Sequence, residues 1–219
     1  MKAFEIVVPC KRFTAGKSRL APVLSPAARA RLCRGLFRHT VQAALQAAGA
    51  GNVAVVSADA EVLALASQLG ARAIAENGQG LNAAIHGANA LLTALRTLPD
   101  AALAGDAPLP GLIVLPIDLP LISAGLLRRT AEQVEAAGIA PDAAQTGTNL
   151  LVLSAGLRRD FPFSYGPDSF ALHRRAARAR GVEPTVIRHD RLAFDLDRPE
   201  DLATLRKAGR GPASTLLMS

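Results

Sequence analysis

The stretch LIVLPIDLPL, residues 112–121, places a single aspartate in an otherwise apolar run. Its first four residues, 112–115, are typical of a strand that is buried on both faces of a parallel sheet. Asp118 follows just past the end of that strand, where open α/β sheets bind their ligands. The Asp118 carboxylate is therefore expected either to bind a metal ion or phosphate or to cap the next turn.

Strand-like and helix-like segments alternate on both sides of this stretch. Apolar runs predict further strands at residues 3–8, 52–57, 71–75, 150–153, 184–188 and 192–196. Helical periodicity and capping residues predict helices that begin near Pro26, Glu61, Leu81, Ser123, Ser169 and Pro199. The alternation predicts the α/β class, with a doubly wound and mostly parallel sheet.

The length and composition fit one domain. Half of the 219 residues are apolar, which is enough for a sizeable core, and we expect a single domain over residues 1–207 with a loose tail at 208–219. Glu5 and Pro9 interrupt the first apolar run, so neither a signal peptide nor a membrane span is expected. Cys10 and Cys33 form no disulfide or metal pattern, which favours a reducing cytoplasm.

The charge balance points to anionic ligands. The chain has 25 basic and 18 acidic residues, a net charge of +7, but the basic residues are scattered along it. Only one Tyr and no Trp are available to stack on bases. Small anionic ligands therefore explain the charge as well as nucleic acid would.

A cationic loop follows the first predicted strand, at residues 9–24, and contains Lys11, Arg12, Lys17 and Arg19. A phosphate-binding P-loop is excluded because Lys11 stands where that motif requires glycine. Such a loop can still wrap a polyphosphate, with Lys as a point charge and Arg as a bidentate donor. The alternative is a solvated loop with no ligand.

A second acidic motif, Asp195-x-Asp197, lies near the C-terminus. Residues two apart on an extended segment point to the same side, so both carboxylates can address one ion that Asp118 meets from a neighbouring strand. Three carboxylates at strand ends suggest Mg²⁺. The alternative is that Asp195 and Asp197 are cap and turn residues before Pro199.

No side chain in the sequence is a convincing candidate for a catalytic nucleophile. The four histidines fall on predicted helices or turns without a serine or cysteine motif beside them: His39, His86, His173 and His189. A substrate phosphate monoester is largely dianionic at neutral pH and can attack without a general base. Transfer of a nucleotidyl group then requires mainly positioning and charge neutralisation.

Six motifs, taken together and in this order, carry a resemblance to a known family. They are VPCKRFTAGKSRLAPVLS at 8–25, ENGQGLNAA at 76–84, LPIDLPL at 115–121, TGTNLL at 146–151, FSYGPDSF at 163–170 and FDLDRPEDL at 194–202. The ordered set resembles the CofC/FbiD family of guanylyltransferases in deazaflavin coenzyme biosynthesis. The resemblance covers nearly the whole chain, whereas the single motifs also occur in other nucleotidyltransferases.

The resemblance implies a GT-A-like nucleotidyltransferase fold and a Mg²⁺-dependent reaction. GMP would pass from GTP to a small phosphorylated hydroxy acid, with release of pyrophosphate. The acid would be 2-phospho-L-lactate, phosphoenolpyruvate or 3-phospho-D-glycerate. By resemblance Asp118, Asp195 and Asp197 match the magnesium-binding aspartates, Lys17 and Arg19 the phosphate-handling loop, and Thr148, Gly166 and Ser169 the positions that hold the acceptor carboxylate.

The remaining expectations concern the guanine base and the partners. The turn from Glu76 through Gly80 to Asn82 is expected either to read guanine, together with Lys11 in the nucleotide site, or to cap the next helix. Asp168 stands where the family often has Gly, so its carboxylate should point away from an acidic acceptor. GTP and a three-carbon phosphorylated acid are the expected partners, a homodimer is left open, and neither nucleic acid nor a membrane is expected.

Two other functions remain as alternatives. A GT-A glycosyltransferase would use a similar carboxylate pair but would normally present aromatic platforms to a sugar, and only 4% of the residues are aromatic. A non-catalytic nucleotide-binding regulatory protein could keep the sheet without turnover. The presence of Lys17 and all three aspartates argues against the regulatory protein.

Overall fold

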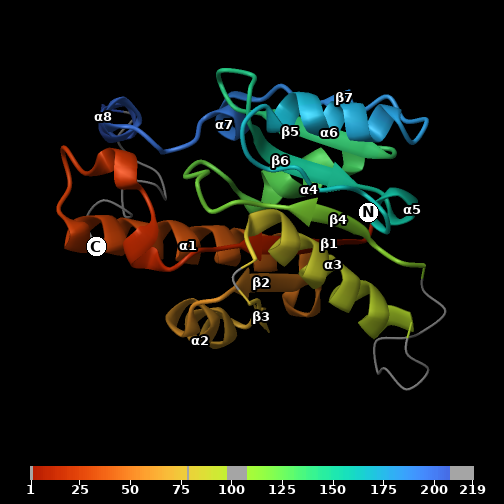
Figure 1. Cartoon of the computed structure of the whole chain (residues 1–219), viewed down its shortest axis with the longest axis horizontal. Coiled ribbons are helices and arrows are strands. Elements are labelled where there is room, and N and C mark those ends of the chain that lie inside the picture. Colours follow the sequence, from red (N-terminus) through yellow and green to blue (C-terminus); the bar gives the residue numbers. More distant parts are fainter. Residues whose placement is uncertain (1, 78, 98–107, 208–219) are drawn as a thin grey trace.

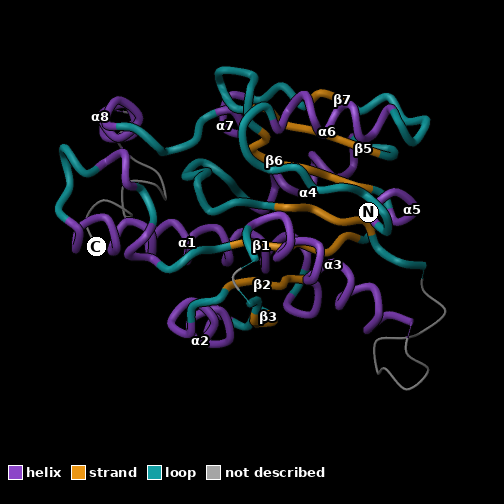
Figure 2. The backbone as a smooth tube through the Cα atoms, in the orientation of Figure 1, coloured by secondary structure: helices purple, strands orange, loops and turns teal. Residues whose placement is uncertain are grey.

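The computed structural model describes residues 2–77, 79–97 and 108–207, which form one seven-stranded sheet between helices (Figure 1). The strand order is β3-β2-β1-β4-β6-β5-β7, which Figure 2 shows from β3 at the bottom to β7 at the top. The strands are β1 Phe4–Pro9, β2 Val53–Ser57, β3 Arg72–Ala75, β4 Gly111–Val114, β5 Ala137–Pro141, β6 Thr148–Leu153 and β7 Thr185–Val186.

The sheet is mostly parallel, as predicted. The neighbouring pairs β1 with β2, β1 with β4, β2 with β3, and β5 with β7 are parallel, whereas β6 runs antiparallel to both β4 and β5. The reversal at β6 follows from a short connection, because β5 returns as β6 without a crossover helix. The doubly wound arrangement therefore holds for β1 to β4, and the other half of the sheet is mixed.

Helices cover both faces of the sheet because successive strand residues point to opposite sides. Val8 of β1 packs in the cluster that contains Phe37 of α1, and its neighbour Val7 packs with Ile85 of α3 on the other face. Helices α1, α2 and α4 cover the first face, and α3 and α6 the second. The helices are α1 Pro26–Ala48, α2 Ala60–Leu69, α3 Leu81–Thr97, α4 Ala124–Gln133, α5 Ala155–Arg158, α6 Ser169–Arg178, α7 Asp190–Ala193 and α8 Pro199–Lys207, with 3-10 helices η1 Phe13–Ala15, η2 Ser18–Leu20 and η3 Ala50–Asn52.

One predicted strand is wrong, and strand β5 and the short helices α5 and α7 were missed. Residues 192–196 were expected to form a strand, but α7 ends at Ala193 and an irregular segment follows it. The apolar residues of this run face two different clusters, because Leu192 joins the sheet core and Leu196 packs under α8. Strand β5 was missed because Gly138 and Pro141 interrupt its apolar pattern. The glycine is needed for packing, since an added β carbon would lie 2.2 Å from Val134 Cγ2.

Two predicted helix caps are confirmed. Ser25 and Ser123 cap α1 and α4, since each side chain accepts a hydrogen bond from the amide three residues later. Cys10 and Cys33 are free and buried. No helix in the described part of the chain is long and apolar enough to span a bilayer. The predicted tail at 208–219, and residues 98–107 of a predicted loop, lie outside the described residues.

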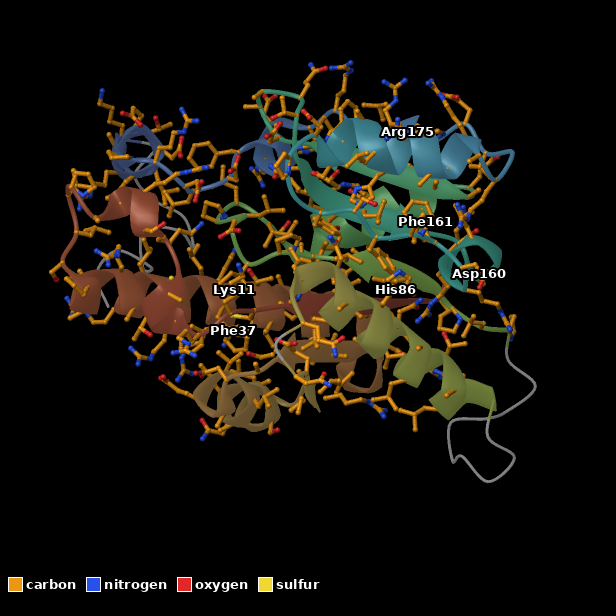
Figure 3. All side chains as sticks on the ribbon, in the orientation of Figure 1. Lys11, Phe37, His86, Asp160, Phe161 and Arg175 are labelled. Carbon is orange, nitrogen blue, oxygen red and sulfur yellow. The ribbon has the colours of Figure 1, made fainter. Side chains whose placement is uncertain are left out.

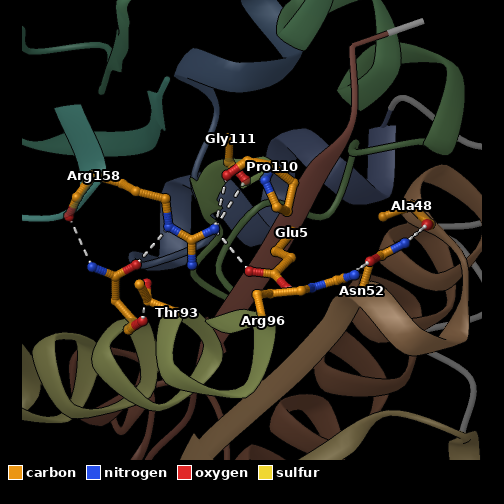
Figure 4. Close-up of polar contacts among 9 residues, drawn as sticks. Glu5, Ala48, Asn52, Thr93, Arg96, Pro110, Gly111 and Arg158 are labelled. Atoms are coloured by element: carbon orange, nitrogen blue, oxygen red, sulfur yellow. Dashed lines mark hydrogen bonds and ion pairs between the residues drawn. The ribbon is translucent and has the colours of Figure 1, made fainter. Parts of the chain in front are cut away.

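A buried polar network fastens β1 to α3 and α5 (Figure 4). Arg158 is fully buried; its Nη1 donates to Glu5 Oε2 at 2.8 Å and its Nε to Asn89 Oδ1 at 2.7 Å. Arg96 donates to the other Glu5 oxygen at 3.0 Å. The network lies at the N-terminal end of β1, away from the cavity described next, and it holds α3 against the sheet.

Candidate active site

A cavity of about 590 Å³ opens where β1 and β4 end. Pro9, the last residue of β1, and Asp118, which follows β4, both line it. Lys11 also lines it and lies at this end of the sheet, whereas Asp160 lies at the opposite end (Figure 3). The carboxyl ends of strands are the expected place for a ligand in an open α/β sheet. The cavity therefore joins the cationic loop to Asp118.

The cationic loop is packed tightly onto α1. Phe13 is buried and meets Phe37 edge-on, with 5.4 Å between ring centroids. Gly16 lies so close to α1 that an added β carbon would be 2.6 Å from Cys33 Sγ. Lys17 follows with φ of +56°, a left-handed conformation that costs a non-glycine residue about 1–3 kcal/mol. This packing fixes the backbone from which the Lys17 side chain extends.

The Lys17 ammonium meets two of the predicted carboxylates. Its side chain is only 4% exposed; Nζ donates to Asp118 Oδ1 and lies 3.8 Å from Asp197 Oδ1. Arg19 Nη1 donates to Asp197 Oδ2. The two aspartates are also joined through the backbone, because the Leu196 amide donates to the carbonyl oxygen of Asp118 at 2.9 Å. Four of the predicted site residues therefore form one cluster.

The alternative in which Asp197 caps the last helix does not hold. The carboxylate of Asp201, in the first turn of α8, accepts hydrogen bonds from the amides of Asp197 at 3.0 Å and Arg198 at 2.6 Å, which ties the segment before the helix to its first turn. Asp197 is left to direct its own carboxylate at Lys17 and Arg19. Its side chain therefore belongs to the cluster and not to the cap.

Asp195 lies at the edge of this cluster. Burial raises the pKa of its carboxyl group, a hydrogen bond with Asn149 opposes this rise, and the charges of Asp197 and Asp118 add to it. In the parts of the chain that the structure describes, no three His, Cys, Asp or Glu side chains have the spacing of a metal site. The donor chemistry nevertheless fits magnesium, because Asp118 and Asp197 present hard oxygens to one shared cation, the Lys17 ammonium.

Two of the three residues singled out in the turn after β3 line the cavity. Glu76 and Gly80 line it, and so does Lys11 from the cationic loop, while Arg19 and Asn82 are not among its lining residues. Asn82 is instead bound to the Tyr165 backbone: its Nδ2 donates to the carbonyl oxygen at 3.0 Å, and its Oδ1 accepts from the amide at 2.7 Å. Its amide group therefore ties α3 to the segment around Tyr165.

Tyr165 is a cavity residue that the sequence reasoning missed. Its position in the turn-rich motif FSYGPDSF, directly before Gly166, was the available signal. Its hydroxyl is buried without a hydrogen-bond partner among the described residues, and its ring meets the His173 ring with 4.8 Å between centroids. Tyr165 thus connects the cavity to the residues predicted to hold the acceptor.

Those acceptor residues form a neighbouring buried cluster. Thr148 and Ser169 are buried, and the Thr148 amide donates to Ser169 Oγ at 2.9 Å. His173 Nδ1 lies 2.9 Å from Thr148 Oγ1, and His173 Nε2 accepts from the Ser164 amide at 3.0 Å. Because Nε2 accepts, the proton of the neutral ring resides on Nδ1, which donates to Thr148. Thr148 is therefore bound by a histidine to which the sequence reasoning assigned no function, and Ser169 is bound to the Thr148 amide.

Gly166 and Asp168 form the exposed part of the same segment. Gly166 has φ of +136° and Asp168 has φ of +56°, which is a left-handed conformation that favours glycine. Thr148, Gly166 and Ser169 do not line the cavity themselves, and Tyr165 is the member of this segment that does.

The buried His173 predicts an acid-sensitive segment. Burial lowers the pKa of His173 from its usual 6.5 to about 4. Between these pH values the unfolded chain binds the additional proton, so the free energy of unfolding should be highest above pH 6.5 and fall by about 3 kcal/mol towards pH 4. Urea denaturation of the wild type and of His173→Gln from pH 4 to 8 would measure this. An equal slope in both proteins would contradict it.

Comparison with solved structures defines the class of the fold. A Desulfovibrio desulfuricans protein, whose crystal structure is assigned to the nucleotide-diphospho-sugar transferases, superposes with a TM-score of 0.66. It is 18% identical, and the match covers 100% of this chain and 95% of that one. The fold is therefore the nucleotide-diphospho-sugar transferase fold, which nucleotidyltransferases share.

Sequence comparison identifies the family. The sequence model of the family described as guanylyl transferase CofC like matches residues 4–216. A phosphoenolpyruvate guanylyltransferase of Rubrobacter xylanophilus is 42% identical over 93% of both chains. A 3-phospho-D-glycerate guanylyltransferase of Phenylobacterium zucineum is 37% identical over 95% of this chain and 90% of that one. The chain belongs to the CofC-like guanylyltransferase family, and the resemblance noted in the sequence is confirmed.

Proposed function

We propose that the protein transfers GMP from GTP to a three-carbon phosphorylated acid, releases pyrophosphate and serves deazaflavin coenzyme biosynthesis. The observation that carries the proposal is the cluster of Lys17, Arg19, Asp118 and Asp197 beside a cavity at the strand ends. Two cations suit the phosphates that leave, and two carboxylates suit Mg²⁺. Family membership supports guanine as the base of the donor nucleotide.

The position of each residue in the cluster suggests which part of the substrate or ion it would bind. Lys17 and Arg19 would bind the β and γ phosphates, and Lys11 lines the cavity close enough to add a third cation. Asp118 and Asp197 would hold magnesium, with Asp195 nearby, and the ion when bound compensates charge that develops at the α phosphate. The acceptor phosphate, largely dianionic at neutral pH, attacks that phosphorus without a protein base, in keeping with the absence of histidine from the described cavity lining.

The proposed base subsite lies in the cavity, and the proposed acceptor subsite lies beside it, behind Tyr165. Glu76 and Gly80 reach it from the turn after β3 and are proposed to read guanine. The acceptor carboxylate would be met by the segment of Thr148, Gly166 and Ser169, next to Tyr165. The Rubrobacter relative supports phosphoenolpyruvate as the acceptor, whereas the Phenylobacterium relative supports 3-phospho-D-glycerate.

One assay tests the proposal. Purified protein is incubated with GTP, Mg²⁺ and each of the three acids separately, and the guanylylated product is detected by mass. A catalyst gives acid-dependent product and pyrophosphate, and ATP in place of GTP should give far less. GTP binding without product from any acid would support the regulatory protein. Turnover of a nucleotide sugar instead would support the glycosyltransferase.

Ser169→Ala is expected to affect the acceptor and spare the nucleotide. Loss of a hydrogen bond to a charged group corresponds to about a 10-fold rise in KM for the preferred acid, while the Kd for GTP should stay within about twofold. Ser164→Ala is the matched control, because Ser164 lies in the same segment and its hydroxyl donates to the Pro162 carbonyl at 3.3 Å. A loss of GTP affinity in Ser169→Ala, with the KM for the acid unchanged, would overturn the placement of the acceptor.

A further inference from the structure

The groups proposed to bind phosphate and the groups proposed to bind magnesium are paired with each other. Lys17 Nζ donates to Asp118 and lies 3.8 Å from Asp197, and Arg19 donates to the second oxygen of Asp197. Phosphates and magnesium each carry the charge opposite to that of the side chains they would meet. Phosphates that bind Lys17 and Arg19, or magnesium that binds the paired oxygens of Asp118 and Asp197, would therefore separate an existing ion pair.

The Lys17 ammonium is the cation that the carboxylates of Asp118 and Asp197 share in this structure. It is the one described cation in contact with both Asp118 and Asp197, and its side chain is 4% exposed compared with 66% for Arg19. Its backbone is fixed by Gly16 against Cys33, so a change of partner needs only rotation of the side chain. A flexible four-carbon stem with a compact charge can make that rotation.

We propose that Lys17 holds the metal-binding carboxylates in the nucleotide-free protein and passes to the triphosphate when GTP and the metal bind together. This inference rests on the proposed function. It makes Lys17 the residue through which the two sites are coupled, with Arg19 exchanging from Asp197 in the same way. The protein would then bind the metal–nucleotide complex far better than either component alone.

The metal–nucleotide complex should bind better because either ligand bound alone leaves charged side chains without a partner of opposite charge. A metal ion bound alone places the buried Lys17 ammonium beside a second cation. GTP bound alone draws Lys17 away and leaves Asp118 and Asp197 facing a polyanion. With both bound, every cation has an anionic partner. Coupling of this kind is reciprocal, so each ligand should tighten the other by the same factor, typically about 5-fold to 150-fold.

The first test measures metal binding to the nucleotide-free protein by calorimetric titration with Mn²⁺. Lys17→Met removes the competing charge and nearly keeps the side-chain length, so its Mn²⁺ affinity should exceed that of the wild type by about 10-fold or more. Lys11→Met is the matched control: Lys11 lines the same cavity, and within the described residues it forms no ion pair with a carboxylate. Its Mn²⁺ affinity should match the wild type.

The outcomes separate this inference from a general charge effect. Equal Mn²⁺ affinity in Lys17→Met and the wild type overturns the exchange, as does an equal gain in Lys11→Met. Adding Asp118→Asn to Lys17→Met should remove the gain if the metal binds at this carboxylate, and a gain that persists overturns the location. Lys17→Gln takes the place of Lys17→Met if thermal unfolding shows that the methionine variant is not folded.

The second test needs no variant. The Kd of the wild type for GTP is measured in excess EDTA and again with saturating Mg²⁺, and the ratio should lie in the range expected for coupling. A ratio near one overturns the exchange even if the acceptor assay yields guanylylated product. Failure of GTP to bind under either condition would instead count against the proposed function, while the Mn²⁺ titration would still decide whether Lys17 competes with a metal.

Discussion

Asp118→Asn is expected to lower kcat by about 100-fold or more at saturating GTP and acid. The change removes one hard negative oxygen from the proposed magnesium site and one partner of Lys17, while it keeps the size of the side chain. Removal of a single group that stabilises transition-state charge typically costs about 100-fold to 1,000-fold in rate. Initial rates of pyrophosphate release, measured over a range of Mg²⁺ concentrations, would give the loss and any shift in metal dependence.

Two comparisons make this prediction specific. Asp197→Asn should act in the same direction, since its carboxylate shares Lys17 with Asp118 and also binds Arg19. Asp160→Asn should leave kcat unchanged, because Asp160 is exposed at the opposite end of the sheet. If both site variants turned over at near wild-type rates with unchanged Mg²⁺ dependence, these aspartates would not be the metal ligands.

Most of the strands, and the position of Asp118 beyond one of them, could be predicted because local signals define them. The apolar run at 112–115 led to the prediction of β4, and placing Asp118 past its end required only the rule for ligand sites in open sheets. The direction of β6 was not predictable in this way. It depends on β5, whose sequence AGIAP has a glycine and a proline in five residues and lacks the usual strand pattern.

The contacts within the site depend on distant packing that no motif records. Lys17 and Asp118 are 101 positions apart, and they meet because Gly16 fits against Cys33 while Leu196 donates to the Asp118 backbone. His173 was assigned no function because nothing in its own sequence pattern shows that Thr148 and Ser164 will bind its two nitrogens. The sequence pointed to Lys17, Arg19, Asp118 and Asp197 as candidates, and tertiary packing decides that these residues touch.

Arg158→Met is expected to reduce the free energy of unfolding by about 3–5 kcal/mol, the usual cost of removing one partner of a buried ion pair. Arg158 and Glu5 are both almost fully inaccessible to solvent, and the pKa of Arg158 is lowered mainly by burial, a sign that the charge is held in a poorly solvated place. Methionine would leave Glu5 to Arg96 alone and Asn89 Oδ1 without its 2.7 Å donor. The loss would be a large share of the 5–15 kcal/mol that typically stabilises a domain.

Urea denaturation of the variant and of Arg159→Met would measure this loss. Arg159 is the adjacent, exposed arginine, and its replacement should change the free energy of unfolding by no more than about 0.5 kcal/mol.

Adding Glu5→Gln to Arg158→Met should restore part of the stability if the cost comes from the uncompensated Glu5 charge, because the neutral amide is easier to bury. No restoration would locate the cost in lost packing and in the unpaired Asn89 instead. A wild-type free energy of unfolding in Arg158→Met would show that the network does not fasten β1 to α3 and α5, and that other contacts hold α3 where it borders the cavity.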